Sequence, residues 1–318
     1  RPWRSARRSA RATPRPLRSV LPARPDESFR SKRKWHDCDV NDTVKGHHGE
    51  AAAERPRLLD VAVPGSTFGI GSLPHLSAGQ AARFAFGASD IPTAPSLPRR
   101  SPAELAVAQA LVGVAGVSLG QYGAVAIDCE QLDPTAVVVT ELAGPQFVGL
   151  RAFLEEGRRR QHTGPVKWQF LGPISVGNAL VRAGADPEIA YAVALGAVRS
   201  HLRALEAAIA VALPASPQLV LLDEPLAGGM MTSDFPLAPD HAIDLLSGAM
   251  AVLETSATVG LHSCADVDLA TLLAAGPHVM SIPIRRDVVS IAGYPVSYTH
   301  LTLPTKEDEC RSRWSPDQ

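Results

Sequence analysis

The chain has 318 residues, of which 45% are hydrophobic and 20% charged, and its formal net charge is -1. This composition is typical of a globular protein with a sizeable core, and the balanced charge predicts no general attraction to nucleic acid or to a membrane surface. No run of about 18 apolar residues and no signal-peptide core is present, so we expect a cytoplasmic protein. The four cysteines are widely scattered without a CxxC pair, which indicates no disulfide framework.

Residues 1–57 differ in character from the rest of the chain. They are rich in Arg, Pro and Ser, and the first acidic residue is Asp26. Because no periodic apolar pattern runs through them, we expect a disordered basic segment. Three interpretations stay open: a nucleic-acid-binding arm, a transit peptide, or upstream sequence translated by mistake. The missing initiator Met favours the third.

From residue 58 to residue 293, apolar runs alternate with turn signals and helical periodicity, which is typical of an α/β protein. The clearest helix is predicted at Pro187–Leu213, after an Asp186 N-cap, and two more at Asp240–Leu253 and Asp266–Ala275. Buried strands are predicted at Ser66–Ile70, Ala136–Thr140, Val166–Phe170, Gln218–Leu222, Thr258–Leu261 and His278–Ile282.

Residues 294–318 lose the β/α rhythm again. Their sequence resembles a translated adapter remnant that recurs at the ends of unrelated proteins, with an ordinary surface tail as the alternative. We therefore expect a non-native or disordered tail, a domain cut near Gly293, and no function for Cys310.

The strand predicted at Thr258–Leu261 runs into His262-Ser-Cys264. Alternate residues of a strand point the same way, so the imidazole and the thiol share one face at the carboxyl end of a strand. In a parallel barrel, that end is where active sites are built. His and Cys together favour zinc. The alternative is a buried, hydrogen-bonded His beside an inert Cys.

Two carboxylates, Asp223 and Glu224, follow the apolar strand LVLL. Carboxylates at a buried strand end need partners or a role. We predict that Asp223 is catalytic and binds an amine or a proton, and that both residues contact the substrate. A solvated carboxylate in a helix-capping loop is the alternative.

Two further segments suggest substrate contacts. In STFGIGSLPH, Gly71 allows a ligand to approach the backbone, and Ser72 offers a hydroxyl and an amide N–H to a carboxylate. His75 is expected to cap or pack locally, with a ligand contact as the alternative. The third glycine of a dinucleotide fingerprint is missing. In VKWQFLGP, Lys167 offers a cation to an anionic substrate, with a solvated surface lysine as the alternative.

Together these stretches resemble the catalytic barrel of the cobalamin-independent methionine synthase family, within the superfamily that includes uroporphyrinogen decarboxylase. The resemblance covers Pro64 to Ile291 and rests on four segments in the family's order: Gly69–His75, Lys167–Pro173, Asp223–Pro225 and His262–Cys264. It implies an α/β fold of the TIM-type (β/α)8 barrel class, incomplete at the C-terminus.

The resemblance also implies roles. His262 and Cys264 match two zinc ligands, Gly71 and Ser72 match the turn that binds the carboxylate of the amino-acid thiol, and Asp223 matches the group that binds its amine. The implied reaction transfers a methyl group from a methyl-tetrahydrofolate to a thiol such as homocysteine. Zinc suits this reaction, because only about 3% of a thiol with a pKa near 8.5 is thiolate at pH 7 and metal binding deprotonates it.

The sequence departs from the family pattern in its last part. Pro283 stands where the family has a Glu ligand, only Asp287 follows closely, and the family's final Cys and late His are not reached. We therefore expect a barrel with an open, association-prone edge and a chain that is inactive by itself. The oligomeric state stays open.

Two other functions stay open as well. One is a decarboxylase or corrinoid-linked thiol methyltransferase of the same superfamily, with Arg99 and Arg100 as an anion site. The other is nucleic-acid binding through the basic N-terminal segment.

Overall fold

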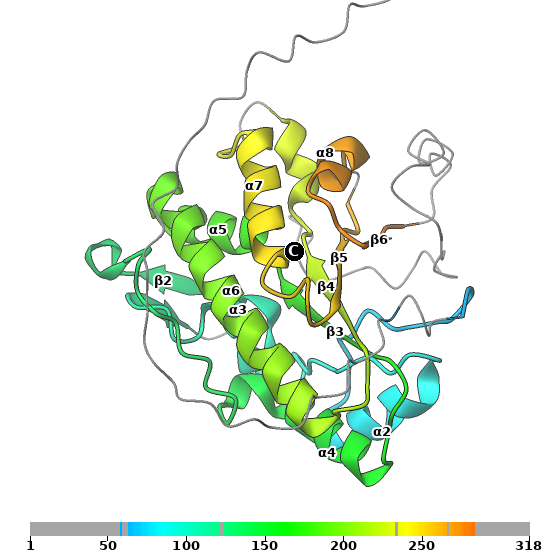
Figure 1. The fold of residues 1–318 in the computed structure, drawn as a ribbon. Coiled ribbons are helices and arrows are strands. Elements are labelled where there is room, and N and C mark those ends of the chain that lie inside the picture. Colours follow the sequence, from blue (N-terminus) through cyan, green and yellow to red (C-terminus); the bar gives the residue numbers. More distant parts are fainter. Residues whose placement is uncertain (1–57, 59–62, 121–123, 233–234, 266, 284–318) are drawn as a thin grey trace, which may run out of the picture. The chain divides into compact units, whose positions relative to one another are not determined.

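The computed structural model describes residue 58 and residues 63–120, 124–232, 235–265 and 267–283. The predicted disordered segments, 1–57 and 294–318, lie outside these residues. A parallel four-stranded sheet is the central element (Figure 1), and its strands follow one another in sequence order. The strands are β3 (Val166–Leu171), β4 (Gln218–Asp223), β5 (Thr258–His262) and β6 (Val279–Ser281). An α/β fold with a parallel sheet is therefore confirmed.

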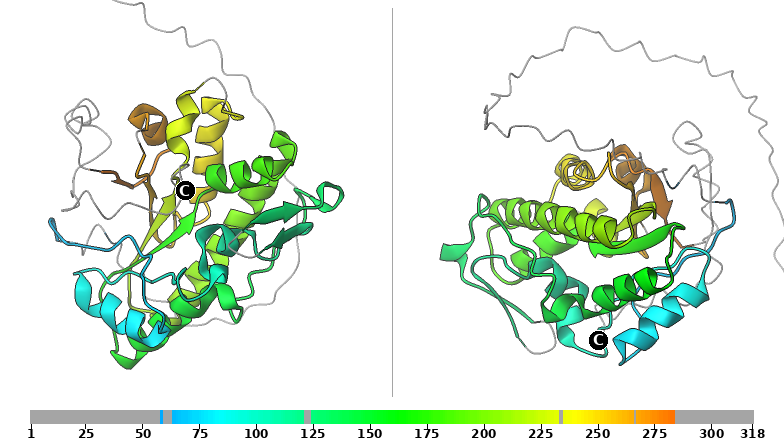
Figure 2. Two further views of the ribbon diagram at one scale, coloured as in Figure 1. Left: turned by 180° about the vertical axis from the view of Figure 1, so that it is seen from behind. Right: turned by 60° about the horizontal axis from the view of Figure 1, so that its bottom comes forward.

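A second, antiparallel pair of strands and seven α-helices complete the elements named in the described residues. The pair consists of β1 (Val117–Leu119) and β2 (Val125–Ile127). The helices are α2 (Ala78–Ala88), α3 (Ala106–Leu111), α4 (Val148–Arg159), α5 (Pro173–Arg182), α6 (Pro187–Ala212), α7 (Pro239–Met250) and α8 (Leu269–Ala274). Short 3-10 turns occur at Pro102–Glu104, Cys129–Gln131, Pro145–Phe147 and Ala227–Met231. Figure 2 shows α5, α6 and α7 together beside β3 and β4.

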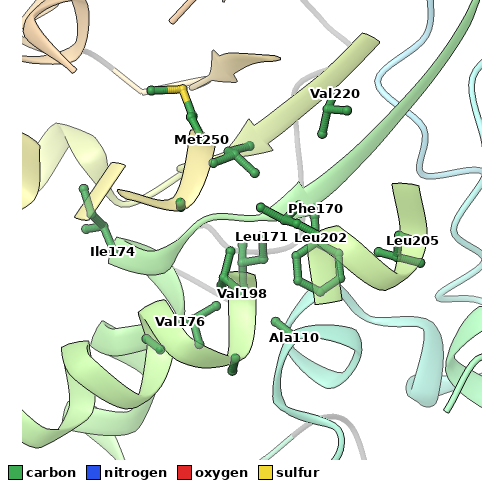
Figure 3. Close-up of a cluster of buried hydrophobic side chains, with 14 of the residues drawn as sticks. Ala110, Phe170, Leu171, Ile174, Val176, Val198, Leu202, Leu205, Val220 and Met250 are labelled. Carbon is green, nitrogen blue, oxygen red and sulfur yellow. The ribbon is translucent and has the colours of Figure 1, made fainter. Parts of the chain in front are cut away.

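The face of the sheet that packs on the helices is apolar. Figure 3 shows Phe170 of β3 and Val220 of β4 among Val198, Leu202 and Leu205 of α6. All five side chains are buried. Each buried aliphatic or aromatic side chain of this kind contributes about 1.5–3 kcal/mol to the stability of the fold. Most of the buried hydrophobic residues belong to the cluster on this face.

The opposite face of the sheet carries both apolar and polar side chains. Leu219 and Leu221 of β4 form a small separate cluster with Ile91 and Leu58. Because side chains alternate along a strand and parallel partners share a face, the register puts Lys167, Asp223 and His262 on this same face. Both faces of β4 and β5 are thus covered, which explains their continuous apolar sequences.

Two further segments extend the sheet beyond β3 by isolated parallel bridges. Thr93 pairs with Lys167, and Ser72 with Ser96. The main-chain N–H of Lys167 donates to Pro92 O at 2.8 Å. The segment around residues 66–73 therefore lies next to residues 91–96, which lie next to β3.

Most predicted elements are confirmed with small changes at their ends. Asp186 caps α6, because its carboxylate accepts from the main-chain N–H of Glu188 at 2.9 Å, and Pro187 occupies the first turn. Asp240–Leu253 corresponds to α7, and β3 to β6 match four predicted strands. The helix predicted at Asp266–Ala275 begins later, at Leu269, because Asp268 is its N-cap.

Two strand predictions were not met. Ser66–Ile70 forms only the bridge from Phe68 to Ile91. The strand predicted at Ala136–Thr140 is wrong. Val137 and Val139 are 85% and 70% exposed and the segment pairs with no described strand, so its β-branched residues have no sheet to stabilise them.

Among the described residues, α6 included, no helix combines the length and the apolar character that crossing a bilayer requires.

Candidate functional site

Polar side chains form a row where the parallel strands end. In the register of the sheet, Leu171 is opposite Asp223, Asp223 is opposite His262, and His262 is opposite Ser281. Asp223, His262 and Ser281 lie on the face turned away from the α6 core, whereas Leu171 belongs to the core cluster that Figure 3 shows. Carboxyl ends of parallel strands are where α/β proteins place their binding groups, so the predicted site residues Asp223 and His262 lie side by side at that end.

His262 is held between two polar partners. Its Nε2 lies 3.0 Å from Cys264 Sγ, and its Nδ1 lies 2.9 Å from Ser281 Oγ. Burial, together with the nearby positive charge of Lys167, lowers the pKa of His262 to about 4. The imidazole is therefore neutral at pH 7, which is the form that binds metals.

The His262–Cys264 pair fits part of a zinc shell. A tetrahedral zinc with bonds of about 2.0–2.1 Å to nitrogen and 2.3 Å to sulfur holds the two donors about 3.5 Å apart. The present separation of 3.0 Å is that of a hydrogen bond, so a shift of roughly half an ångström would admit the ion. In the part of the chain that the structure describes, no group of three or more His, Cys, Asp or Glu side chains gathers around one point. Two donors fit zinc, and a complete shell is not formed by the described residues.

Pro283, where the resemblance placed a Glu ligand, lies just after β6 and offers no ligand atom in its side chain. Asp287, the carboxylate that the sequence offers downstream, falls outside the described residues.

Lys167 is buried rather than solvated. Its side chain is 1% exposed, and its Nζ donates to Gly69 O at 3.0 Å and to Ile70 O at 2.7 Å, with Gln169 Oε1 as a third acceptor. Burial lowers the pKa of Lys167, and the negative charge of Asp223 opposes that shift. An ammonium group has three N–H donors, and these three acceptors account for all of them. Lys167 thus braces the turn at residues 69–71, and its predicted substrate contact has no support in its geometry.

Gly71 lies directly on the side chain of Gln169. Its φ is +119°, and a Cβ added there would come within 2.8 Å of Gln169 Cδ. The position therefore requires glycine both for its backbone conformation and for the close approach. Ser72, the next residue, is exposed, and its Oγ lies 3.1 Å from Ser96 Oγ. The glycine turn and β3 are thus brought together.

Asp223 has an unsatisfied oxygen inside the site. Its Oδ1 is buried without a hydrogen-bond partner. Burial raises the pKa of Asp223, and the nearby Lys167 opposes that shift. A buried carboxylate oxygen without a donor is unfavourable by about 1–3 kcal/mol or more, so a ligand that donates a proton or a positive charge would be stabilised here.

Glu224 points away from this row and binds the first turn of α5. Its carboxylate accepts from Ile174 N and Ser175 N, both at 2.9 Å, and from Ser175 Oγ at 2.7 Å. Gly172 allows this approach, because a Cβ there would lie 2.1 Å from Glu224 Oε1. Glu224 therefore anchors a helix N-terminus, and its predicted contact with substrate has no support in these contacts.

The remaining candidates have local roles. Arg99 and Arg100 are both exposed, and Arg100 pairs with the buried Glu104 at 3.2 Å. His75 packs on Phe84 with ring centroids 5.2 Å apart, as the sequence suggested.

Sequence reasoning missed Ser281 as a site residue. A strand was predicted at His278–Ile282, but its place beside His262 follows only from the parallel register of β5 and β6.

Comparisons with protein-family models, with curated proteins and with solved structures found no match to this chain.

Proposed function

We propose that this protein is a zinc-dependent methyltransferase of the cobalamin-independent methionine synthase type. It would transfer a methyl group from a methyl-tetrahydrofolate to a small thiol such as homocysteine. The observation that carries the proposal is the His262–Cys264 contact of 3.0 Å at the carboxyl end of a parallel strand.

We further propose that the described strands are part of a TIM-type barrel. The neighbours β3 to β6 follow sequence order without a reversal, whereas the sheet of a doubly wound fold reverses its order at a switch point. The bridges through Thr93 and Phe68 continue the same order on the other side of β3. In a barrel, the face with Lys167, Asp223 and His262 would be the interior.

The state of His262 favours a metal site over a Cys–His nucleophile. In a Cys–His nucleophile, the imidazolium stabilises the thiolate. Burial and Lys167 lower the pKa of His262, so the imidazolium is disfavoured at neutral pH. A zinc ion would supply the missing positive charge, deprotonate a bound thiol and leave it nucleophilic.

The other residues of the row suit an amino-acid thiol. Asp223 offers a buried oxygen without a partner to the ammonium group of such a substrate. The turn at Gly71 and Ser72, braced by Lys167, offers a main-chain N–H and a hydroxyl to its carboxylate. Lys167 links these two positions, because its ammonium donates to the turn and is attracted electrostatically by Asp223.

A cobalt titration of the full chain tests the proposal. Co²⁺ occupies zinc sites and gives a sulfur-to-metal charge-transfer absorption when a thiolate binds. We expect this band in the wild-type chain and its loss in Cys264→Ser and His262→Ala. The matched control is Cys129→Ser, because Cys129 is exposed and lies outside the site, where its Sγ contacts Gly184 O. An unchanged band in Cys264→Ser, or no band in the wild type at millimolar cobalt, would refute the metal site.

A further inference from the structure

Ser281 lies beside the imidazole of His262 on the side opposite the thiol. Its Oγ is 2.9 Å from Nδ1, while Nε2 faces Cys264 Sγ. We propose that Ser281 is a positioning residue, which fixes the ring orientation and the tautomer of His262 so that the lone pair of Nε2 points at Cys264. The role as a ligand-positioning residue rests on the metal site proposed above.

The contacts of Ser281 select one tautomer. A neutral imidazole carries its proton on one nitrogen and a lone pair on the other. An imidazole nitrogen is a better hydrogen-bond acceptor than a thiol sulfur, so Nε2 accepts from the Cys264 thiol and the ring proton lies on Nδ1. The Nδ1–H group then donates to the Ser281 hydroxyl at 2.9 Å, which stabilises this tautomer. The Nε2 atom then has the free lone pair.

The fold holds Ser281 rigidly in this place. Ser281 is opposite His262 in the parallel register, and its carbonyl also accepts from Ser263 N at 3.1 Å. Close approach of β6 to β5 requires Gly260, because a Cβ at that position would lie 2.3 Å from Val279 O. The hydroxyl therefore reaches the ring because the two strands are pressed together at this glycine.

The arrangement has a direct consequence for ligand binding. A lone pair on Nε2 can accept the Cys264 thiol proton in the metal-free protein, and it can bind a metal once that proton leaves. The opposite tautomer would place an N–H between nitrogen and sulfur and block the metal. Groups that orient a ligating histidine in this manner typically change metal affinity by about 10- to 100-fold.

Two measurements on the full chain test this inference. The first is a long-range ¹H–¹⁵N NMR spectrum of ¹⁵N-histidine-labelled protein without metal at pH 7, with His262 assigned by His262→Gln. We expect a protonated Nδ1 and an unprotonated Nε2 for His262. In Ser281→Ala the Nδ1–H tautomer should lose population, and Ser281→Thr, which keeps the hydroxyl, should restore it. Ser256→Ala is the control, because Ser256 Oγ bonds only to Leu253 O among its described contacts, in the turn before β5.

The second measurement is the cobalt affinity of the same variants. We expect binding about 10- to 100-fold weaker in Ser281→Ala and near wild type in Ser281→Thr and Ser256→Ala. An Nε2–H tautomer in the wild type, or a Ser281→Ala variant with unchanged tautomer and affinity, would overturn the inference. If the tautomer depends on Ser281 but the wild type binds no cobalt, then the proposed metal function fails while the orienting contact stands.

Discussion

Replacement of Glu224 by Ala should destabilise the fold strongly, although Glu224 lies outside the polar row. The carboxylate is fully buried and accepts from two main-chain N–H groups and one hydroxyl at the start of α5. The Ser175 hydroxyl can rotate toward another acceptor, whereas the N–H groups of Ile174 and Ser175 cannot. Two buried donors without acceptors are unfavourable by about 1–3 kcal/mol each, so we expect a loss of about 2–6 kcal/mol in the free energy of unfolding.

The assay is urea denaturation of the full chain at pH 7, followed by circular dichroism. Glu224→Gln keeps one acceptor oxygen, so its free energy of unfolding should fall by about half as much as that of Glu224→Ala. The control is Glu155→Ala, because Glu155 is exposed on α4, and its loss should stay within about 0.5 kcal/mol. If Glu224→Ala loses no more than Glu155→Ala, the assigned anchoring of α5 is wrong.

Lys167, Gly71 and Glu224 can each be tested by a further substitution. Lys167→Met removes the donor to Gly69 O and Ile70 O. Because a buried acceptor without a donor is unfavourable by about 1–3 kcal/mol, amide hydrogen exchange at residues 69–72 should accelerate at least about tenfold while β4 stays protected. Equal exchange at these residues in the wild type and in Lys167→Met would contradict the assigned role of Lys167. Gly71→Ala should destabilise by about 1–3 kcal/mol through backbone strain, whereas Gly87→Ala, in α2 with open space around its added Cβ, should stabilise by about 0.5–1 kcal/mol; the reverse order in thermal melts would contradict this. Burial raises the pKa of Glu224 from 4.5 to about 7, so the folded state binds the carboxyl proton more tightly than the unfolded state does. The contribution of this proton to the free energy of unfolding is complete below about pH 4.5 and is lost as the pH rises through 7. Denaturation from pH 4 to pH 8 should show a shallower decline in Glu224→Gln, and an identical decline would contradict the assignment.

The sequence by itself determined much of the local structure. Asp186 followed by Pro187 and a long helical period predicted α6, because an N-cap and an apolar stripe are local signals. The apolar run before Asp223 predicted β4, and the HxC spacing predicted that His262 and Cys264 share a face, which their 3.0 Å contact confirms.

Other local signals pointed the wrong way. The valines at 137 and 139 have high strand propensity, yet both are exposed, because no neighbouring strand is available there. Strand propensity reports the fit to a half-buried sheet, and the sheet itself is not encoded in five residues.

Only the tertiary structure decided the roles of the charged residues. Lys167 and Glu224 were both predicted to contact substrate, since a charged group next to an apolar strand suggests function. The fold brings Gly69 and Ile70 onto Lys167 across 98 and 97 positions of sequence, and α5 onto Glu224 across 49 or 50. A side chain's partners depend on such long-range contacts, which no local pattern contains. For the same reason Ser281 was recognised as a neighbour of His262 only when the parallel register of β5 and β6 placed the two residues side by side.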